Sequence, residues 1–553
     1  MLKKTRVVLA VVFWLGITLL LLDFTGALHG WLGWMAKIQF LPAVMALNVG
    51  VIVALCLLTL VFGRVYCSVI CPLGVFQDAI SHLGTRKDKK PYQYRKENKW
   101  LRYGVWVLFV AALVAGVQAF VALLAPYSAY GRMVESLLQP VYLWGNNLLA
   151  ALAERAGSYA FYEKEVWLRS LPTLVVAVVT LVVVVVLSFK GGRTYCNSIC
   201  PVGTTLGFIS RFAMFRPVID ASQCVRCHSC ERKCKAHCIE ITKERVQIDY
   251  SRCVDCFNCV ESCPKGGLKY RFAWGACAKP ASSAHGAPSD TAACAKPASS
   301  AHQPAPTAKG SSAKGTFADA SLRDPVQANA SAEVPSAEAK AEAGPNGRRA
   351  FLLGSAVAVG TAALKDVQAR AQGAKKVDGG LAEVLPKEAP VRETPLTPPG
   401  SRCVKDFYRR CTACQLCVAE CPNNVLRPSG SLEHLMQPEM SFEKGWCRPE
   451  CTRCSELCPS GAIREITREE KTEYHVGTAR VNLEACLSAT GQSPCGKCVR
   501  VCPSGAVIMV KDPGTGNLMP TVAEEVCIGC GACENLCPVR PVSAITVHGK
   551  RSI

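Results

Sequence analysis

Residues 224–234 read CVRCHSCERKC, and residues 253–264 read CVDCFNCVESCP. This spacing, C-x2-C-x2-C-x3-C in two successive copies, is typical of bacterial domains that hold a pair of 4Fe-4S clusters. Three neighbouring thiolates hold one cluster, and the fourth cysteine of each copy reaches over to the other cluster. The spacing therefore predicts two ligand sets, one formed by Cys224, Cys227, Cys230 and Cys263, and one formed by Cys253, Cys256, Cys259 and Cys234.

Some details of this stretch leave alternatives open. Lys235, rather than proline, follows Cys234, so Cys238 is a candidate substitute for Cys234. Residues 224–228 also match the attachment motif of c-type haem, and C-x2-C pairs occur in zinc ribbons. Iron-sulfur clusters remain the favoured interpretation, because the cysteines continue in the longer spacing.

Four further cysteine groups lie near the C-terminus, each ending in Cys-Pro. They are Cys411, Cys414, Cys417 and Cys421; Cys447, Cys451, Cys454 and Cys458; Cys486, Cys495, Cys498 and Cys502; and Cys527, Cys530, Cys533 and Cys537. The second and third groups have longer first intervals, as expected for loops inserted between ligands. These groups predict four more 4Fe-4S clusters, six in all, but adjacent and nested exchanges of the fourth cysteine both fit. Residues 461–466, 505–510 and 543–548 are predicted to form short strands beside the clusters.

A second repeat precedes the first cluster pair. Residues 63–74 read GRVYCSVICPLG and residues 192–203 read GRTYCNSICPVG. Each copy follows an apolar run, so Cys67, Cys71, Cys196 and Cys200 are expected at the same depth in the membrane, at its cytoplasmic interface. Such thiols can hold a metal cluster, form redox-active dithiols, contact a quinol or simply pack.

Apolar runs at 7–22, 41–62, 101–125 and 171–189 predict four transmembrane helices. Basic residues lie before the first run, between residues 64 and 99, and after the fourth run. Because cytoplasmic segments of membrane proteins are enriched in Lys and Arg, both ends of this unit are expected in the cytoplasm. The near-neutral loop 126–170 is then outside. The first run can alternatively be read as a cleaved signal peptide.

The composition excludes other classes of protein. A chain of 553 residues exceeds one compact domain, and 33 cysteines in so long a chain do not indicate a disulfide scaffold. The formal charge of +21 is partly offset by clusters of about −2 each, and the basic residues beside apolar runs report membrane orientation. No nucleic-acid partner is indicated.

Residues 273–345 are rich in Ala, Pro, Ser and Lys and are predicted to form a disordered linker. Arg348 and Arg349 then precede a modest apolar stretch, and residues 369–371 offer a small-residue cleavage site. This segment, 346–371, resembles a twin-arginine export signal, although a chance arginine pair is the alternative. Clusters are inserted in the cytoplasm, so a folded domain at 372–553 is the kind of cargo that this resemblance implies.

The predicted fold class is an α-helical membrane domain joined to α+β modules like bacterial ferredoxins. The predicted order is a four-helix membrane domain (1–215), a cytoplasmic two-cluster domain (216–272), the linker (273–345), the signal (346–371) and a periplasmic four-cluster domain (372–553). The expected location is the bacterial inner membrane.

Residues 1–272 resemble the membrane-bound quinol dehydrogenase ferredoxin subunit of periplasmic nitrate reductase systems, and residues 346–553 resemble its periplasmic ferredoxin partner. The chain thus resembles a fusion of the two. The resemblance implies a quinol dehydrogenase component that passes electrons from the membrane quinone pool to a periplasmic c-type cytochrome or reductase. The alternatives are regulation or assembly of a respiratory reductase, and another client such as methylamine utilisation.

A quinol releases protons as well as electrons, so a proton acceptor is expected near a membrane interface. Asp78 and His82 follow the first Cys-x3-Cys-Pro motif, and Asp23 and His29 lie on the predicted outer side. All four are also readily explained as ordinary solvated residues.

Overall fold

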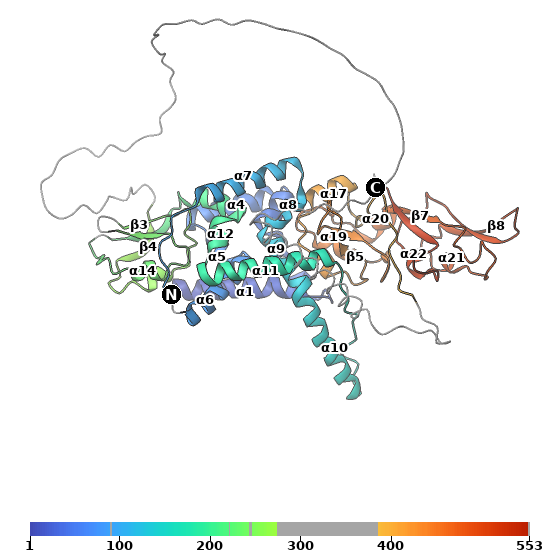
Figure 1. Ribbon diagram of the computed structural model, residues 1–553, viewed down its shortest axis with the longest axis horizontal. Coiled ribbons are helices and arrows are strands. Elements are labelled where there is room, and N and C mark those ends of the chain that lie inside the picture. Colours follow the sequence, from blue (N-terminus) through green and yellow to red (C-terminus); the bar gives the residue numbers. More distant parts are fainter. Residues whose placement is uncertain (89–90, 221, 243–245, 274–384, 551–553) are drawn as a thin grey trace, which may run out of the picture. The chain divides into compact units, whose positions relative to one another are not determined.

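The computed structural model describes residues 1–88, 91–220, 222–242, 246–273 and 385–550 (Figure 1). Nearly all of the predicted linker and the whole twin-arginine-like segment lie outside these residues, so both remain predictions. The described residues belong to one compact unit. We call residues 1–210 the helical unit, 215–272 the N-terminal module and 385–550 the C-terminal module.

The repeat in sequence is a repeat in structure. In the first copy a helix, a short helix and a third helix follow one another: α4 (Val49–Phe62), α5 (Val65–Val69) and α6 (Pro72–Asp88). The second copy has the same order: α11 (Leu171–Gly191), α12 (Thr194–Ser198) and α13 (Pro201–Ser210). Gly63 and Gly192 end the first helix of each copy with φ of 76° and 58°, which glycine adopts without steric cost. The Cys-Pro pair then starts the third helix, because proline is tolerated in a first turn.

Two of the four apolar runs form single long helices. They are α1 (Leu2–Leu22) and α11, and within the described residues only these are long and apolar enough to cross a membrane by themselves. The run 41–62 is instead divided between α3 (Phe40–Met45) and α4, because Leu47 is left-handed and Asn48 caps α4. The run 101–125 is divided between α7 (Lys99–Ala115) and α8 (Gln118–Leu124) at the left-handed Gly116. The prediction of four continuous transmembrane helices is therefore not confirmed.

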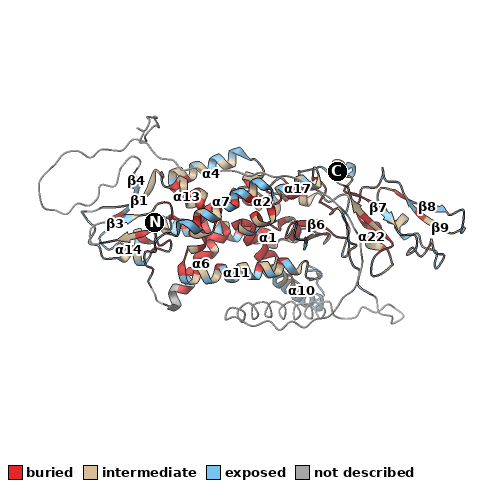
Figure 2. Ribbon diagram, turned by 45° about the horizontal axis from the view of Figure 1, so that its top comes forward, coloured by how far each residue is buried: buried red, intermediate tan, exposed pale blue. Residues whose placement is uncertain are grey.

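The remaining helices complete the helical unit. They are α2 (His29–Lys37), α9 (Pro126–Met133), the π-helical turn η1 (Val134–Leu138) and α10 (Gln139–Arg155). Helix α11 packs on α6 and α9, α1 packs on α2, α5 and α6, and α13 packs on α4 and α7. Buried residues are concentrated on α6, where they are red in Figure 2, and on α9, whose residues are all buried, whereas α1 buries only a minority of its residues. Tyr66, Leu73 and Tyr127 are among the side chains that fill this core.

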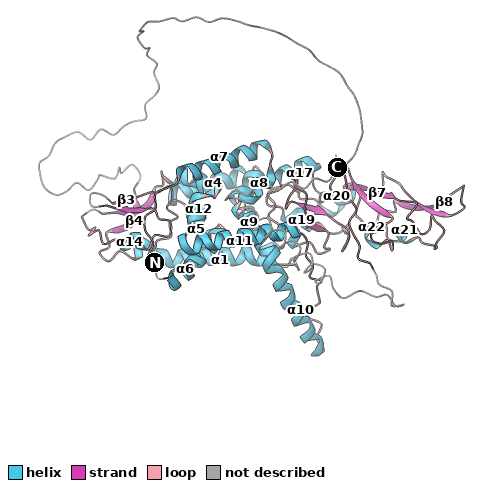
Figure 3. Ribbon diagram, viewed as in Figure 1, coloured by secondary structure: helices cyan, strands magenta, loops and turns pink. Residues whose placement is uncertain are grey.

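The two modules are built from short strands and single-turn helices between cysteine loops (Figure 3). In the N-terminal module β1 (Phe215–Ile219) pairs antiparallel with β4 (Leu268–Phe272), and β2 (Ile239–Ile241) pairs with β3 (Val246–Ile248). Helices α14 (Ser229–Arg232) and α15 (Asn258–Glu261) follow the middle cysteines of the two groups.

The C-terminal module has three antiparallel pairs: β5 (Leu426–Pro428) with β6 (Pro438–Met440), β7 (Gly477–Val481) with β10 (Ile545–Gly549), and β8 (Val507–Lys511) with β9 (Leu518–Val522). Its helices are α17 (Val404–Arg410), α18 (Leu416–Ala419), α19 (Arg453–Leu457), α20 (Arg468–Glu473), α21 (Lys497–Arg500) and α22 (Ala532–Leu536).

Two of the three predicted strands in this module are confirmed, since β8 and β10 cover most of 505–510 and 543–548. The strand predicted at 461–466 is wrong. That segment is a loop in which the Arg464 amide donates to the Gly400 carbonyl and the Ile463 amide points at the Cys458 sulfur.

Candidate metal centres

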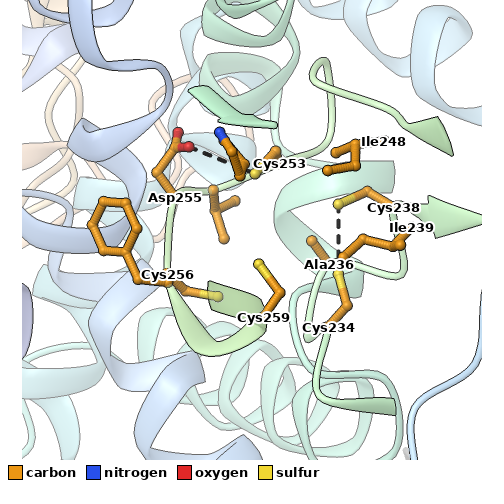
Figure 4. A pocket seen from close by; sticks show the side chains of 12 residues that line it. Cys234, Ala236, Cys238, Ile239, Ile248, Cys253, Asp255, Cys256 and Cys259 are labelled. Carbon is orange, nitrogen blue, oxygen red and sulfur yellow. Dashed lines mark hydrogen bonds between the residues drawn. The ribbon is translucent and has the colours of Figure 1, made fainter. Parts of the chain in front are cut away.

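Each cysteine group of the N-terminal module lines a cavity. One cavity is lined by Cys224, Cys227, Cys230 and Cys263. The other is lined by Cys234, Cys238, Cys253, Cys256 and Cys259, whose side chains surround a common space in Figure 4. Both cavities bring together the three neighbouring cysteines of one group and the fourth cysteine of the other, as the spacing predicts.

Cys234 and Cys238 both reach the second cavity. Their sulfur atoms lie 3.5 Å apart, and both side chains are buried. Cys238 also lies beside Cys253. The geometry therefore keeps Cys238 as a candidate ligand, as the missing proline after Cys234 suggested.

The C-terminal cavities decide the exchange that spacing left open. One cavity is lined by Cys447, Cys451, Cys454 and Cys421. Another is lined by Cys486, Cys495, Cys498 and Cys537. Cys458 lies near Cys411, Cys414 and Cys417, of which Cys417 also has Cys454 nearby. Around Cys533 the nearby thiols are Cys527, Cys530 and Cys502. The fourth cysteines are thus exchanged between adjacent groups, first with second and third with fourth.

The backbone around the middle cysteine explains how these loops suit an anionic cluster. In four groups the residues on both sides of this cysteine are left-handed: Arg226 and His228, Asp255 and Phe257, Ala413 and Gln415, and Gly529 and Gly531. Successive right- and left-handed residues turn their amides toward one side and form a concave anion site, a nest. Most of these residues are not glycine, so the surrounding fold must stabilise a costly conformation.

The cavities do not suit a single ion. Among the residues that the structure describes, no group of three or more His, Cys, Asp or Glu side chains is placed to hold one metal ion. The cysteines stand around a space instead of converging on a point. A 4Fe-4S cluster, which takes one thiolate per iron at its periphery, fits this donor set.

We expect the Cys421→Ala variant to test the exchange. It should remove about four irons, because the cluster of Cys447, Cys451 and Cys454 loses its fourth ligand. Anaerobic alkylation followed by mass spectrometry should find those three cysteines newly reactive and Cys411, Cys414 and Cys417 still protected.

The matched control is Cys458→Ala, for which the reactive and protected sets should be reversed. The exchange would be contradicted if the Cys421→Ala change made Cys411, Cys414 and Cys417 reactive and left Cys447, Cys451 and Cys454 protected.

The two Cys-x3-Cys-Pro motifs meet inside the helical unit. Cys67, Cys71, Cys196 and Cys200 are each at most 5% exposed. Three of these cysteines share one hydrophobic core with Cys414 of the C-terminal module. We call the four side chains the four-thiol centre.

The two aspartates among the candidate proton acceptors are both engaged in other interactions. Asp78 is buried, not solvated, because Arg193 (2.8 Å), Lys235 (3.4 Å) and Arg6 all bind its carboxylate. Asp23 follows α1 and accepts amide hydrogen bonds from Thr25, Gly26 and Leu28. Asp78 is thus bound in an ion-pair network, and Asp23 caps the turn after α1. Neither carboxylate is arranged as a free base.

His82 and His29 are the other two candidates from the sequence. His82 is exposed, and His29 is half-buried beside the C-terminal module, where burial lowers its pKa.

Glu420 is a residue that the sequence did not single out. It is 1% exposed, and neither carboxylate oxygen has a hydrogen-bond partner among the described residues. Burial, reinforced by the charge of Asp23, raises the pKa of Glu420 to about 8. In the sequence Glu420 is one of the residues between two ligand cysteines, and nothing there indicates that it is buried. Only the tertiary structure shows this burial.

Comparison with known proteins agrees with this picture. A family model described as a 4Fe-4S binding domain matches residues 44–91 and 173–218, which contain the two Cys-x3-Cys-Pro motifs. Models described as 4Fe-4S dicluster domains match residues 216–264 and 493–541. No solved structure matches the chain.

Three relatives illustrate the similarity. The methylamine utilization ferredoxin-type protein MauM of Methylorubrum extorquens is 36% identical over 26% of this chain and 67% of its own length. The ferredoxin-type protein NapG of Escherichia coli K12 is 31% identical over 35% of this chain and 81% of its own length. The ferredoxin-type protein NapF of the same organism is 28% identical over 31% of this chain and 98% of its own length.

Proposed function

The chain belongs to the family of ferredoxin-type iron-sulfur proteins, and on that basis we propose that it carries electrons from membrane quinol to a periplasmic acceptor. In this proposal the 24 cysteines of the six groups hold six 4Fe-4S clusters, with Cys238 as the alternative to Cys234. The chain acts as a fused quinol dehydrogenase component and periplasmic ferredoxin. A nitrate reductase system, reached directly or through a c-type cytochrome, is the proposed client.

The shared core of the helical unit and the C-terminal module carries this proposal. Cys414 packs in the same core as Cys67, Cys71 and Cys200, and the Gln139 side chain donates to the Ala419 carbonyl at 2.9 Å. An electron leaving the apolar helices therefore meets a cluster loop without crossing solvent. Since a quinol gives up two electrons and a cluster takes one, a series of clusters suits the task.

The charge pattern supports an orientation across the membrane. Basic residues lie on the side of the N-terminal module, which we place in the cytoplasm. The C-terminal module packs on α9 and the residues that follow it, which we place in the periplasm. The interrupted helices then lie within the bilayer, where buried broken helices are tolerated if their backbone groups are satisfied.

The similarity to MauM favours a second client. In that case the same chain serves a methylamine-utilisation system, and only the periplasmic acceptor differs. Oxidation of the pre-reduced protein by candidate periplasmic cytochromes, measured as loss of the reduced-cluster signal, separates the two clients.

The central experiment adds a reduced menaquinone or ubiquinone analogue anaerobically to the full chain in lipid nanodiscs. Electron paramagnetic resonance should show reduced clusters within the dead time of manual mixing, at an intensity comparable to that after dithionite. If dithionite reduces the clusters and neither quinol does, electron delivery from quinol is wrong. A role in regulation or assembly of a reductase would then be favoured.

A further inference from the structure

We propose that a cavity between η1, α10 and the loop that leads into α11 binds the head group of the membrane quinol, with Glu135 as the acceptor of its proton. The polar residues that carry this proposal lie between residues 135 and 169. They are outside the segments that match the 4Fe-4S binding domain, which contain the four-thiol centre. The assignment rests on the proposed function, because it names the place where the quinol reacts.

Buried polar side chains that line this cavity are joined by hydrogen bonds. Arg169 donates to Glu135 (2.9 Å) and to the side-chain oxygen of Gln139 (2.8 Å). The Ser136 hydroxyl donates to the other Glu135 oxygen at 2.8 Å. Glu135 is 5% exposed and has one cation as a partner, whereas Asp78 is bound by three. A carboxylate can accept about four hydrogen bonds, so Glu135 keeps room for a quinol hydroxyl.

Trp167 supplies the cavity with a donor that lacks a partner. It lines the same cavity, and its indole nitrogen is buried with no hydrogen-bond partner among the described residues. A buried donor that is left unpaired is costly, and a quinol or quinone oxygen can accept from it. The cavity thus offers one acceptor and one donor to a ring that carries an oxygen at each end.

The wall of the cavity is fixed before any ligand binds. The Asn147 side chain on α10 donates to the Lys164 carbonyl (2.7 Å) and accepts from the Lys164 amide (2.9 Å). Asn146 donates to the Tyr162 carbonyl at 2.9 Å. These bonds tie the loop before α11 to α10. Glu135 itself lies in the π-helical turn η1, and such turns are rare and frequent at functional sites.

Helix α10 offers a lipid-soluble ligand an apolar approach to this cavity. The helix projects away from the rest of the helical unit (Figure 1), and Val141, Trp144 and Leu148 are exposed on it. Their spacing of three and four residues places them on one face. An apolar face with an exposed tryptophan is typical of a helix at the membrane–water interface. A quinol can therefore insert its ring into the cavity and leave its apolar tail in the bilayer.

Gln139 connects the cavity with a cluster loop of the C-terminal module. Its side-chain oxygen accepts from Arg169, and its amide donates to the Ala419 carbonyl at 2.9 Å. Ala419 lies two residues before Cys421, a predicted cluster ligand. Pro428 of β5 also lines the cavity. Electrons from a bound quinol thus have a short route into the C-terminal module.

The reaction at this site balances with the groups named. Oxidation of one quinol to quinone breaks two O–H bonds and releases two protons and two electrons. Glu135 takes the proton of one hydroxyl, passes it to water on the outer side, and then takes the second. Arg169 and Glu165 are the other charged residues that line the cavity. The two electrons leave one after the other to oxidised 4Fe-4S clusters, each of which accepts one.

The test follows cluster reduction by a reduced menaquinone analogue at several concentrations, by rapid-freeze electron paramagnetic resonance on the full chain in lipid nanodiscs. Glu135→Gln should lower the maximal rate about 100-fold or more, the usual contribution of a general base, and leave the half-saturating concentration unchanged. Trp167→Phe should raise that concentration roughly two- to tenfold, because one hydrogen bond is lost, and leave the maximal rate unchanged. The matched control is Glu154→Gln, which changes an exposed carboxylate of α10 and should behave like the parent.

The outcomes separate the site from the proposed function. Dithionite should reduce the clusters of every variant equally. If dithionite reduces the parent and the quinol does not, the proposed function is wrong. If the quinol reduces the parent, Glu135→Gln and Trp167→Phe with the same kinetics, the function stands and this site is overturned.

A second measurement needs only the parent and therefore does not depend on how the variants fold. A photoreactive azido-quinone should label residues 135–143 and 165–173, as found by mass spectrometry of peptides, and excess quinol should suppress the label. Suppressible label confined to other segments would overturn the site.

Discussion

The Arg193→Met variant should be less stable than the parent by about 3 to 5 kcal/mol, the usual cost of removing one partner of a buried ion pair. Arg193 is completely buried, and its guanidinium donates to Asp78 (2.8 Å) and to the Cys67 carbonyl (2.7 Å). Methionine fills a similar volume without a donor. Asp78 would then keep only Arg6 and Lys235, and the Cys67 carbonyl would lose this partner.

Thermal unfolding in detergent, followed by tryptophan fluorescence, measures this effect. The control is Arg211→Met, because Arg211 is exposed and its hydrogen bond to the Tyr103 hydroxyl (2.8 Å) lies at the surface. Its loss should cost no more than about 1 kcal/mol. Equal unfolding temperatures for the two variants would show that the Asp78 network does not hold the repeat together.

The Gly131→Leu variant should separate the C-terminal module from α9. Gly131 is buried, and a β-carbon at this position would clash with the carbonyl oxygen of Cys414. A side chain can be accommodated only if the two backbones move apart. Overpacking of this kind costs about 1 to 3 kcal/mol, which corresponds to a roughly five- to 150-fold shift of the docking equilibrium.

Hydrogen–deuterium exchange on the full chain measures the separation. Exchange should become faster in α9 and in residues 414–419, where Gln139 binds the Ala419 carbonyl. The matched control is Gly145→Leu on α10, because a β-carbon on Gly145 meets no atom within 4 Å. Unchanged exchange around Cys414 in the Gly131→Leu variant would refute the close approach of the two segments.

Neither Gly131 nor the ion-pair network of Asp78 could have been identified from the sequence. Gly131 lies in a loop that the hydropathy pattern placed outside the membrane, and nothing in its neighbours indicates a contact with Cys414. Asp78 follows a cysteine motif and suggested a proton acceptor. Its burial among three cations depends on residues from α1, the second repeat and the N-terminal module.

The sequence alone determined the features that are local. Cysteine spacing predicted the loops around each N-terminal cavity, and the duplicated Gly-Arg and Cys-Pro pairs predicted an internal repeat, each copy of which follows an apolar run. Such features depend on neighbours a few residues apart, because a left-handed glycine or an initial proline acts on its own segment. Two of the three strands predicted in the C-terminal module were found for the same reason.

Only the tertiary structure decided which distant segments meet. It assigned Cys421 to the cavity of Cys447 and Cys537 to the cavity of Cys486. It divided two apolar runs at Leu47 and Gly116, and it brought four thiols from two repeats around two buried arginines. The physical reason is that these contacts join residues far apart in the chain, both where a fourth cysteine is exchanged and where one repeat packs on the other. Spacing along the chain does not encode such contacts.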